Sequence, residues 1–203
     1  MANKRPYRST LREKAKINTQ NSILEAAVKL HGQGDTSVES LAEEAGVSVP
    51  TIRKYFPTKE NLFEGCTNHF MQTYTIPSLE AMNEIGDPRD RMVNVVEEIY
   101  GFIEMTMGFI WLGYQLQDES DVMKKTIAEL ESYCHGAAAV VLKDHPFDRE
   151  RKRKESLGLV TGLLSPLTYR SLRLIGGLKP EQCIRHTVRI VGSILFGEPD
   201  GCP

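Results

Sequence analysis

The sequence predicts an all-α protein of about nine helices: an amino-terminal three-helix domain that contains a helix-turn-helix, followed by a larger helical domain. Along most of the 203 residues, apolar positions recur every three to four residues, which is the spacing of one face of a helix. No stretch alternates like a strand between turn residues, and no repeat period of about 20–50 residues is visible. These observations argue against sheet-containing folds and repeat arrays.

The chain begins with a basic segment. Residues 1–16 contain six Lys or Arg and one Glu, although the formal net charge of the whole chain is only −2. A segment so rich in one sign of charge and so poor in apolar residues is typical of a disordered tail. We therefore expect residues 1–13 to form a flexible basic arm.

A short helix is expected to start near residue 37. Thr36 or Ser37 can cap it, and Thr36 with Glu39 fits a capping box. Gly46 can end it, because glycine adopts a positive φ at little cost. The apolar face of this helix comprises Val38, Leu41, Ala42 and Ala45.

A second short helix follows the glycine. Ser48 can cap it, and Pro50 is tolerated in its first turn because no N–H is needed there. Ile52 and Phe56 form a buried i, i+4 pair, with Val49 beside them. The outward side then carries Pro50, Thr51, Arg53 and Lys54, with Tyr55 at the margin.

This outward side has the chemistry needed to approach duplex DNA. Hydroxyls and cations contact phosphates and base edges, and Arg53 can address a guanine with two hydrogen bonds. An isolated Arg-Lys pair is more often a solvated face, but the helix-turn-helix around it favours DNA binding. The basic arm could likewise follow phosphates or enter a minor groove, or it could serve only to keep the protein in solution.

Four segments together resemble the amino-terminal domain of the tetracycline-repressor (TetR) family of transcriptional regulators. They are Ile23-Leu-Glu-Ala-Ala-Val-Lys-Leu30, Leu41-Ala-Glu-Glu-Ala-Gly-Val-Ser48, Thr51-Ile-Arg-Lys-Tyr-Phe56 and Thr58-Lys-Glu-Asn-Leu62. The resemblance covers about residues 14–74. It implies a homodimer that binds a palindromic double-stranded DNA operator and is released by a small ligand.

Residue roles follow from the same resemblance. Thr51, Lys54, Tyr55 and Lys59 match positions that contact DNA, and Lys59 would meet a phosphate. Arg53 departs from the family, which commonly has Tyr there, and Tyr55 stands where His or Tyr is usual, so the base preference does not carry over. The candidate DNA-binding residues are Ser48, Pro50, Thr51, Arg53, Lys54, Tyr55 and Lys59.

The boundaries that follow are a DNA-binding domain over 14–74, with its helix-turn-helix at 37–56, and a ligand-binding and dimerisation domain over 75–203. We expect helices from Thr58 to near Pro77, from Asp87-Pro88 onward, and from residues 118–121 to about 143. Because Gly101, Gly108 and Gly113 interrupt an apolar stretch, we expect a broken or short helix over 109–116. The last two helices are expected over 149–175, with a kink at Pro166, and over 180–196.

These last two helices are apolar on more than one side, so they must be buried on more than one side. A second copy of the chain could supply the extra contact in a two-fold four-helix interface. The alternative is a monomer with a central terminal hairpin. The candidate interface residues are Leu159, Leu163, Ile184, Val188, Val191 and Leu195.

Aromatic and Met residues are frequent in the middle helices. They could line an apolar pocket with Tyr and His groups as polar anchors, or they could be plain core. The family resemblance favours a pocket, and the nearly charge-free stretch 105–117 favours a hydrophobic or aromatic effector. The candidate pocket residues are Phe102, Met105, Phe109, Trp111, Tyr114, Tyr133, His135 and Tyr169.

Other function classes find little support. Four widely spaced cysteines suggest neither a disulfide framework nor a zinc site, and no cofactor or metal is expected. Motifs of hydrolases, nucleotide-binding enzymes and metalloproteases are absent, so we expect no enzyme. Without a secretory signal or an apolar run of about 18 residues, a cytoplasmic protein with no membrane partner is expected. A DNA-binding architectural or interaction protein without an effector is the alternative function.

Overall fold

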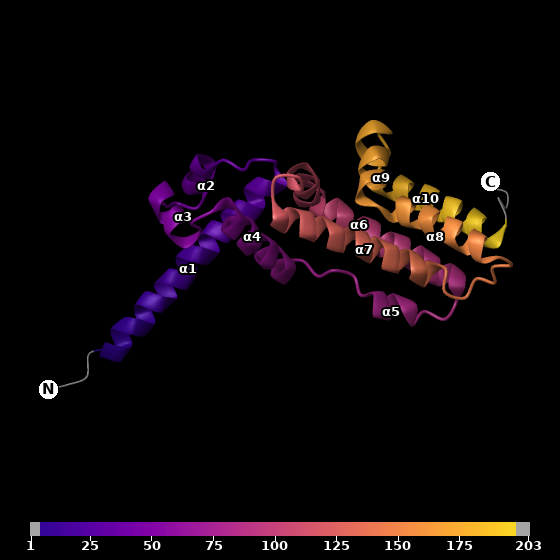
Figure 1. The fold of residues 1–203 in the computed structure, drawn as a ribbon, viewed down its shortest axis with the longest axis horizontal. Coiled ribbons are helices and arrows are strands. Elements are labelled where there is room, and N and C mark those ends of the chain that lie inside the picture. The colour runs from indigo at the N-terminus through magenta and orange to yellow at the C-terminus, as the bar shows by residue number, and fades with distance from the viewer. Residues whose placement is uncertain (1–4, 198–203) are drawn as a thin grey trace. The chain divides into compact units, whose positions relative to one another are not determined.

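The structure, a computed structural model, describes residues 5–197, and the chain divides into two compact units. The first unit runs to Thr75 and also includes Trp111–Thr126. The second comprises Ile76–Ile110 and the chain from Ile127 onward. All secondary structure within the described residues is helical (Figure 1), so the all-α prediction is confirmed. Cys202 and the first four residues of the expected arm lie outside the described part.

Four helices build the amino-terminal part of the first unit: α1 (Arg5–Gly32), α2 (Val38–Glu44), α3 (Val49–Tyr55) and α4 (Lys59–Thr73). Ile23 of α1 and Cys66 of α4 are fully buried between them. At Gly65 of α4, an added Cβ would lie 2.9 Å from both Leu24 and Phe56 side-chain carbons. Close approach of these elements therefore depends on the absence of a side chain at residue 65.

Helix α1 begins at Arg5, whereas we expected residues 1–13 to be a flexible arm. Residues 5–13 thus belong to a 28-residue helix. Most of the residues here favour helix, and adding turns to a helix that is already packed at its carboxyl half avoids the unfavourable nucleation step. Residues 10–18 are all exposed, as a basic segment with few apolar side chains should be, but they are helical and not a disordered tail.

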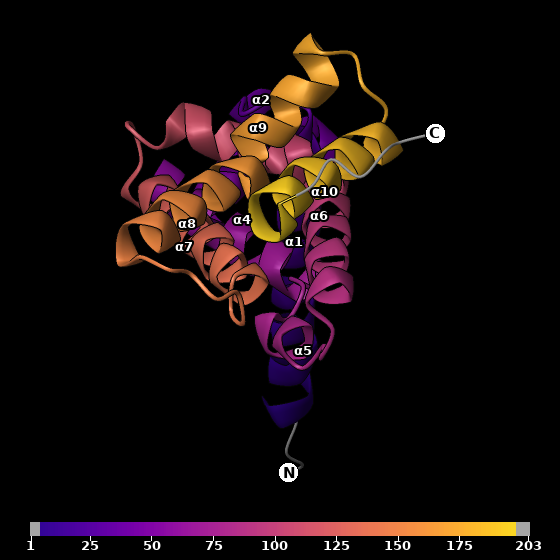
Figure 2. The same ribbon diagram turned by 90° about the vertical axis from the view of Figure 1, so that its right-hand side faces the viewer.

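The second unit contains α5 (Leu79–Asn83), most of α6 (Pro88–Leu116) and of α7 (Asp121–Val141), and then α8 (Glu150–Leu164), α9 (Pro166–Arg170), the π-helical turn η1 (Ser171–Ile175) and α10 (Pro180–Phe196). Figures 1 and 2 show α7 next to α8 and α6 next to α10. The described residues form ten α-helices rather than about nine. Helix α5 was not expected, although Ser78 caps it by accepting a hydrogen bond from the Ala81 N–H.

Helix α6 continues to Leu116, so the break that we expected over 109–116 is wrong. Each glycine costs only about 1 kcal/mol in a helix interior relative to alanine. Burial of Phe109, Ile110 and Leu112 offsets that cost, since a large apolar side chain contributes about 1.5–3 kcal/mol when fully buried. Tertiary packing therefore overrides the local preference.

Pro166 divides the helix that we expected to be kinked over 149–175. Ser165, with φ −65° and ψ 140°, ends α8 and caps α9. Proline offers no N–H, so carbonyl groups at the end of α8 take other donors. The Tyr100 hydroxyl donates to the Leu163 carbonyl at 2.6 Å and lies 3.0 Å from the Thr187 hydroxyl. Burial raises the pKa of Tyr100 to about 12.

A buried arginine joins the start of α6 to the end of α7. Arg91, only 1% exposed, donates to the carbonyls of Ile85 at 2.7 Å and Val140 at 3.1 Å. It also pairs with Asp144 at 2.6 Å. Because these partners come from three segments of the second unit, Arg91 fixes their relative positions.

A second ionic cluster holds η1 against α6. Arg173 forms a two-pronged pair with Glu104, with N···O distances of 2.9 and 2.7 Å, and the Tyr169 hydroxyl donates to the same carboxylate at 2.9 Å. The hydrogen bonds from Arg173 lower the pKa of Glu104. This cluster anchors the segment that follows the Pro166 break.

Stability of the first unit should depend on His31. Its side chain is 2% exposed against Phe63, its Nδ1 has no hydrogen-bond partner, and burial lowers its pKa to about 4 despite the opposing charge of Asp35. A depressed histidine pKa gives stability that is fully present above the unfolded-state value of 6.5 and is lost progressively as the pH falls from 6.5 through the folded-state value of about 4. Between pH 7.5 and 5, denaturant unfolding should show a loss of about 2 kcal/mol.

The matched variant is His31→Leu, which cannot take up a proton. Its stability should change much less over the same pH range, whatever its stability at pH 7.5. A parent and a variant with equal pH dependence would show that His31 is not the responsible group.

Candidate nucleic-acid interface

Helix α2 and the following turn position the reading helix. Ser37 caps α2 by accepting a hydrogen bond from the Ser40 N–H at 3.2 Å, so the cap is Ser37 and not Thr36. Gly46 has φ 65°, and the Val47 N–H reaches back to the Ala42 carbonyl at 3.0 Å. A residue with a side chain would be strained at Gly46. The turn is therefore fixed by local backbone bonds.

Helix α3 starts as the sequence predicts. Ser48 accepts a hydrogen bond from the Thr51 N–H at 3.3 Å, and Pro50 lies in the first turn. Ile52 is 2% exposed and Phe56 is 6% exposed. Both anchor the inward side of a helix of only seven residues. With that side fixed, the opposite side must face outward.

The outward side carries Pro50, Arg53 and Lys54 as expected, whereas Thr51 is less exposed than we expected. Ser48, Pro50, Arg53 and Lys54 are exposed, whereas Thr51 and Tyr55 are half-buried. The Thr51 hydroxyl lies 2.9 Å from that of Ser48, so the two small polar groups form one cluster. The structure thus places two hydroxyls, the apolar ring of a proline and two exposed cations on and next to one short helix.

Lys59 is the exposed first residue of α4. Thr58 caps this helix by accepting a hydrogen bond from the Asn61 N–H at 3.1 Å. A cation is unfavourable at a helix amino terminus by itself, whereas an anion is favoured there by the helix dipole and the free N–H groups. Lys59 and the α4 terminus together would therefore suit a phosphate.

Glu60 has a structural role that we did not foresee. Its Oε2 accepts hydrogen bonds from the Ser120 hydroxyl at 3.1 Å and the Val122 N–H at 3.2 Å. These bonds tie the start of α4 to the start of α7 within the first unit. No local signal in the sequence could have found them, because their partners are about sixty residues apart.

Comparisons with known proteins agree with this geometry. The family described as "Bacterial regulatory proteins, tetR family" matches residues 23–66, which span the carboxyl half of α1 to the middle of α4. The nucleoid occlusion factor SlmA of Alteromonas mediterranea is 31% identical over 146 residues, which cover 69% of this chain and 71% of SlmA. The chain belongs to the tetR family of bacterial regulatory proteins. It is therefore a DNA-binding regulator and not an enzyme.

The tetR-family fold extends over most of the chain. A TetR-like transcriptional regulator from Rhodococcus sp. RHA1 superimposes with a TM-score of 0.65 at 15% identity, covering 89% of this chain and 97% of that protein. A second transcriptional regulator from the same organism gives a TM-score of 0.63 at 17% identity, with coverages of 92% and 98%. At these identities the likeness shows the fold alone.

The candidate pocket residues are not one group in this tetR-family chain. Trp111 and Tyr114 belong to the first unit, and the other six belong to the second. Phe102, Phe109 and Tyr169 are buried, whereas Met105 is 59% exposed. Polar anchors are already engaged: the Tyr133 hydroxyl donates to the Pro77 carbonyl at 2.8 Å, and His135 contacts Thr161 at 3.3 Å. Several of these residues thus serve the core or the surface.

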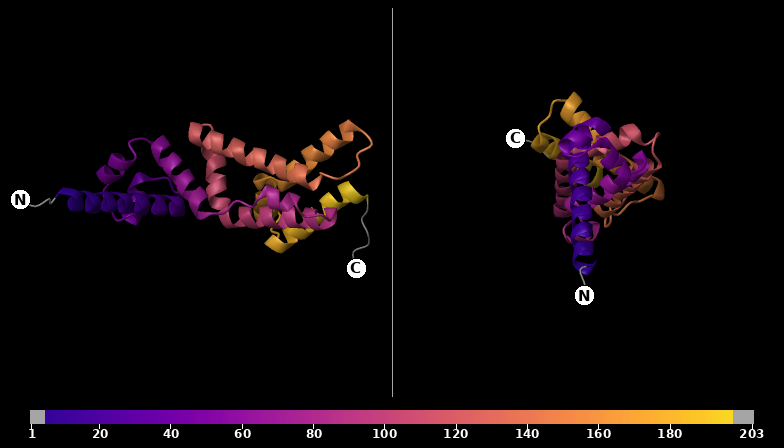
Figure 3. Two further views of the ribbon diagram at one scale, coloured as in Figure 1. Left: turned by 90° about the horizontal axis from the view of Figure 1, so that it is seen from below. Right: turned by 90° about the vertical axis from the view of Figure 1, so that its left-hand side faces the viewer.

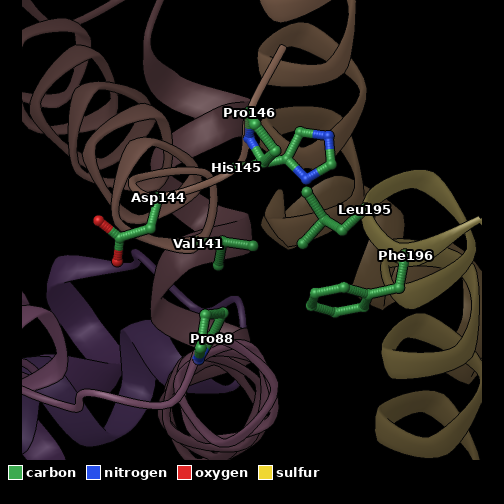
Figure 4. A pocket seen from close by; sticks show the side chains of 7 residues that line it. All are labelled: Pro88, Val141, Asp144, His145, Pro146, Leu195 and Phe196. Atoms are coloured by element: carbon green, nitrogen blue, oxygen red, sulfur yellow. The ribbon is translucent and has the colours of Figure 1, made fainter.

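Two hollows in the second unit are lined by other residues. One, of about 300 Å³, lies between the start of α6, the α7–α8 loop and the end of α10 (Figure 4). Its lining is Pro88, Val141, Asp144, His145, Pro146, Leu195 and Phe196. The other, of about 390 Å³, shares His145 and Pro146 with it and includes Leu159. The sequence did not indicate either one.

The candidate dimer residues divide into two sets. Val191 and Leu195 are 0% and 5% exposed within one protomer, so they pack in its own core and are removed from the candidate interface. Leu163, Ile184 and Val188 are half-buried, and Leu159 is 58% exposed. The strongest apolar stripe of α10 faces inward, because that helix is amphipathic and one protomer already supplies its apolar partner.

Other site chemistry is limited in the described part of the chain. Cys66, Cys134 and Cys183 are free and buried, and burial raises the pKa of the Cys66 thiol to about 12. Among residues 5–197, no three His, Cys, Asp or Glu side chains cluster as metal ligands would. No helix in the same range is both long enough and apolar enough to span a membrane.

Proposed function

We propose that the protein acts as a homodimeric repressor, which places α3 of each copy in the major groove of a palindromic operator. The observation that carries the proposal is the exposed face of α3, opposite the buried Ile52 and Phe56. Two such helices about one duplex turn apart, ~34–36 Å, would match the two halves of a palindrome. Occupancy of a promoter would then exclude polymerase.

The residues have distinct roles in this proposal. Arg53 addresses a guanine, and Lys54 and Lys59 contact phosphates. The hydroxyls of Thr51 and Ser48 donate hydrogen bonds to the sugar-phosphate backbone of the DNA. Tyr55 lies at the edge of the contact. Pro50 offers an apolar surface without an N–H, which suits contact with a thymine methyl group.

The proposal includes release by a small hydrophobic or aromatic effector. The nearly charge-free stretch 105–117 and the aromatic residues of α6 support this class of ligand. Such an effector acts only through its differential affinity for the DNA-binding and released states. A ligand that bound both states equally would leave operator occupancy unchanged.

A second candidate is a DNA-binding interaction protein without an effector. The similarity to SlmA favours it, since that relative is named as a nucleoid occlusion factor and not as a repressor. In this case the second unit would bind another protein while α3 holds the chain on DNA.

Sequencing of duplex fragments bound by the full protein, selected from the source genome, tests both candidates. A repressor should recover a few palindromic sites at promoters, and a reporter fused to such a promoter should be silenced by the protein. Many dispersed sites outside promoters, with no effect on a reporter, would instead favour the interaction protein. Recovery of no enriched duplex would contradict both.

The dimer can be tested with Leu159→Glu. Because Leu159 is 58% exposed in the protomer, the substitution should leave each chain folded. A charge buried against a second copy would be unpaired, so sedimentation should show monomers at concentrations where the parent is dimeric. Leu174, also 58% exposed but on η1, provides a matched control as Leu174→Glu. A Leu159→Glu protein that remained dimeric would place the interface elsewhere.

A further inference from the structure

We propose that the amino-terminal half of α1 is a second, rigid DNA-contact element that binds the phosphates flanking the operator half-site through Arg12 and Lys16. The proposal rests on the proposed function, because it requires α3 of the same unit to occupy the major groove. It replaces the expected mobile arm by a fixed helical surface.

Where its side chains are described, this half of α1 is open to solvent. Every residue from Thr10 to Asn18 is exposed, and the first buried residue after them is Ile23. The helix from Arg5 to Asn18 is about 20 Å long at 1.5 Å per residue. Figures 1 and 3 show it extending past α2 and α3 at its amino end. A helix of this length without apolar burial is marginal alone and is sustained by the packed half that follows.

The helical repeat fixes which side of this extension carries Arg12 and Lys16. Eleven residues make roughly three turns, so residues separated by eleven lie on the same face. Arg12 lies eleven residues before Ile23, and Lys16 lies eleven before Ala27. Ile23 and Ala27 are both 0% exposed against the other helices of the first unit. In the first unit α1 packs against α2 and α4. The face of α1 that is buried there therefore continues as a basic face beyond them.

Lys14 lies on a different side of the same helix. It precedes Glu25 by eleven residues, and Glu25 is exposed to solvent. Lys14 therefore has the same charge, the same exposure and nearly the same position along the helix, but it does not lie on the face of α1 that is buried against α2 and α4. Lys14 therefore serves as a control for which side of α1 contacts the DNA.

A polyanion fits this surface better than a protein partner. Among the side chains that the structure describes, no carboxylate pairs with Arg12 or Lys16. Leu11 and Ile17 are 51% and 49% exposed, but they are six residues apart and lie on different sides of the helix. Without an apolar stripe, a helix-binding protein groove has little to bury. In the sequence, Arg5 and Arg8 continue the same basic spacing.

The test uses a duplex selected by the full protein, prepared in a long form with flanks and a short form trimmed to the two half-sites. Arg12→Gln/Lys16→Gln should bind the long duplex roughly tenfold or more weakly than the parent. For a dimer that loses four phosphate contacts, the slope of log affinity against log salt should become shallower by about three to four. The control Lys14→Gln/Lys154→Gln carries the same change in charge and should behave like the parent.

The short duplex separates flanking contacts from other effects. Removing the flanks should weaken DNA binding by the parent by about the same factor as the double substitution does. The affinity of Arg12→Gln/Lys16→Gln should hardly differ between the long and the short duplex. Equal weakening on both duplexes, or binding of the variant like the parent, would overturn the inference while leaving the repressor proposal intact. A parent that binds no selected duplex would refute the proposed function itself. Circular dichroism of both variants establishes that α1 stays helical.

Discussion

Replacing Arg91 by methionine should lower the free energy of unfolding by about 2–4 kcal/mol. The substitution keeps an unbranched apolar stem but removes every donor. The carbonyls of Ile85 and Val140 would then lose a hydrogen bond, and a buried group left without its partner costs about 1–3 kcal/mol. Urea unfolding at neutral pH, followed by circular dichroism, measures the difference.

The carbonyl groups, and not the ion pair, should account for most of this effect. Asp144 has a side chain that is 51% exposed, so water can replace Arg91 around it. Asp144→Asn keeps an oxygen that can accept from the buried Arg91 and removes only the charge of the half-exposed partner, so it should cost about 1–2 kcal/mol, less than Arg91→Met. If Asp144→Asn were as destabilising as Arg91→Met, the charge pair would be the main contribution.

Arg53→Ala should weaken operator binding by about 1–3 kcal/mol, or roughly 5- to 150-fold, for each half-site, and relax the preference at one base pair in each. Loss of a two-pronged contact to one base removes discrimination there, whereas other positions keep theirs. Lys59→Ala should weaken binding of all duplexes nearly uniformly and flatten the salt dependence, because a phosphate carries no sequence information. Fluorescence anisotropy with the selected duplex and single-base variants separates the two patterns.

Lys54→Ala should also weaken binding, and the exposed Lys154 of α8 supplies a control of equal charge. Lys154→Ala should leave affinity within about twofold of the parent, since it lies outside the proposed contact. Parent-like binding by Arg53→Ala, Lys54→Ala and Lys59→Ala together would mean that another surface reads the DNA.

The helix-turn-helix could be predicted closely because its signals are local. Ser48 lies next to the helix that it caps, Gly46 occupies the turn that needs a positive φ, and Ile52 with Phe56 needs only a helical repeat to share a side. Of the two caps that the sequence offered, Thr36 and Ser37, the structure uses Ser37, and a margin of one residue is usual at helix ends.

Long-range packing could not be predicted from the same patterns. The stripe of Val191 and Leu195 shows that α10 must be buried on one side, but not whether the same chain or a second copy covers it. Likewise, the tyrosines of a possible pocket look alike in sequence, although Tyr133 is held by the Pro77 carbonyl and Tyr169 by Glu104. Partners more than fifty residues away decide these roles.

The interruption at Pro166 selects one alignment of three helices in the second unit. Apolar side chains can slide past one another by a helical turn and still be buried, whereas hydrogen bonds are directional. By freeing the Leu163 carbonyl for the Tyr100 hydroxyl, the interruption creates a junction between α6, α8 and α10 that one alignment of the three helices satisfies. The break between α8 and α9 thus fixes how α6 and α10 are aligned along α8.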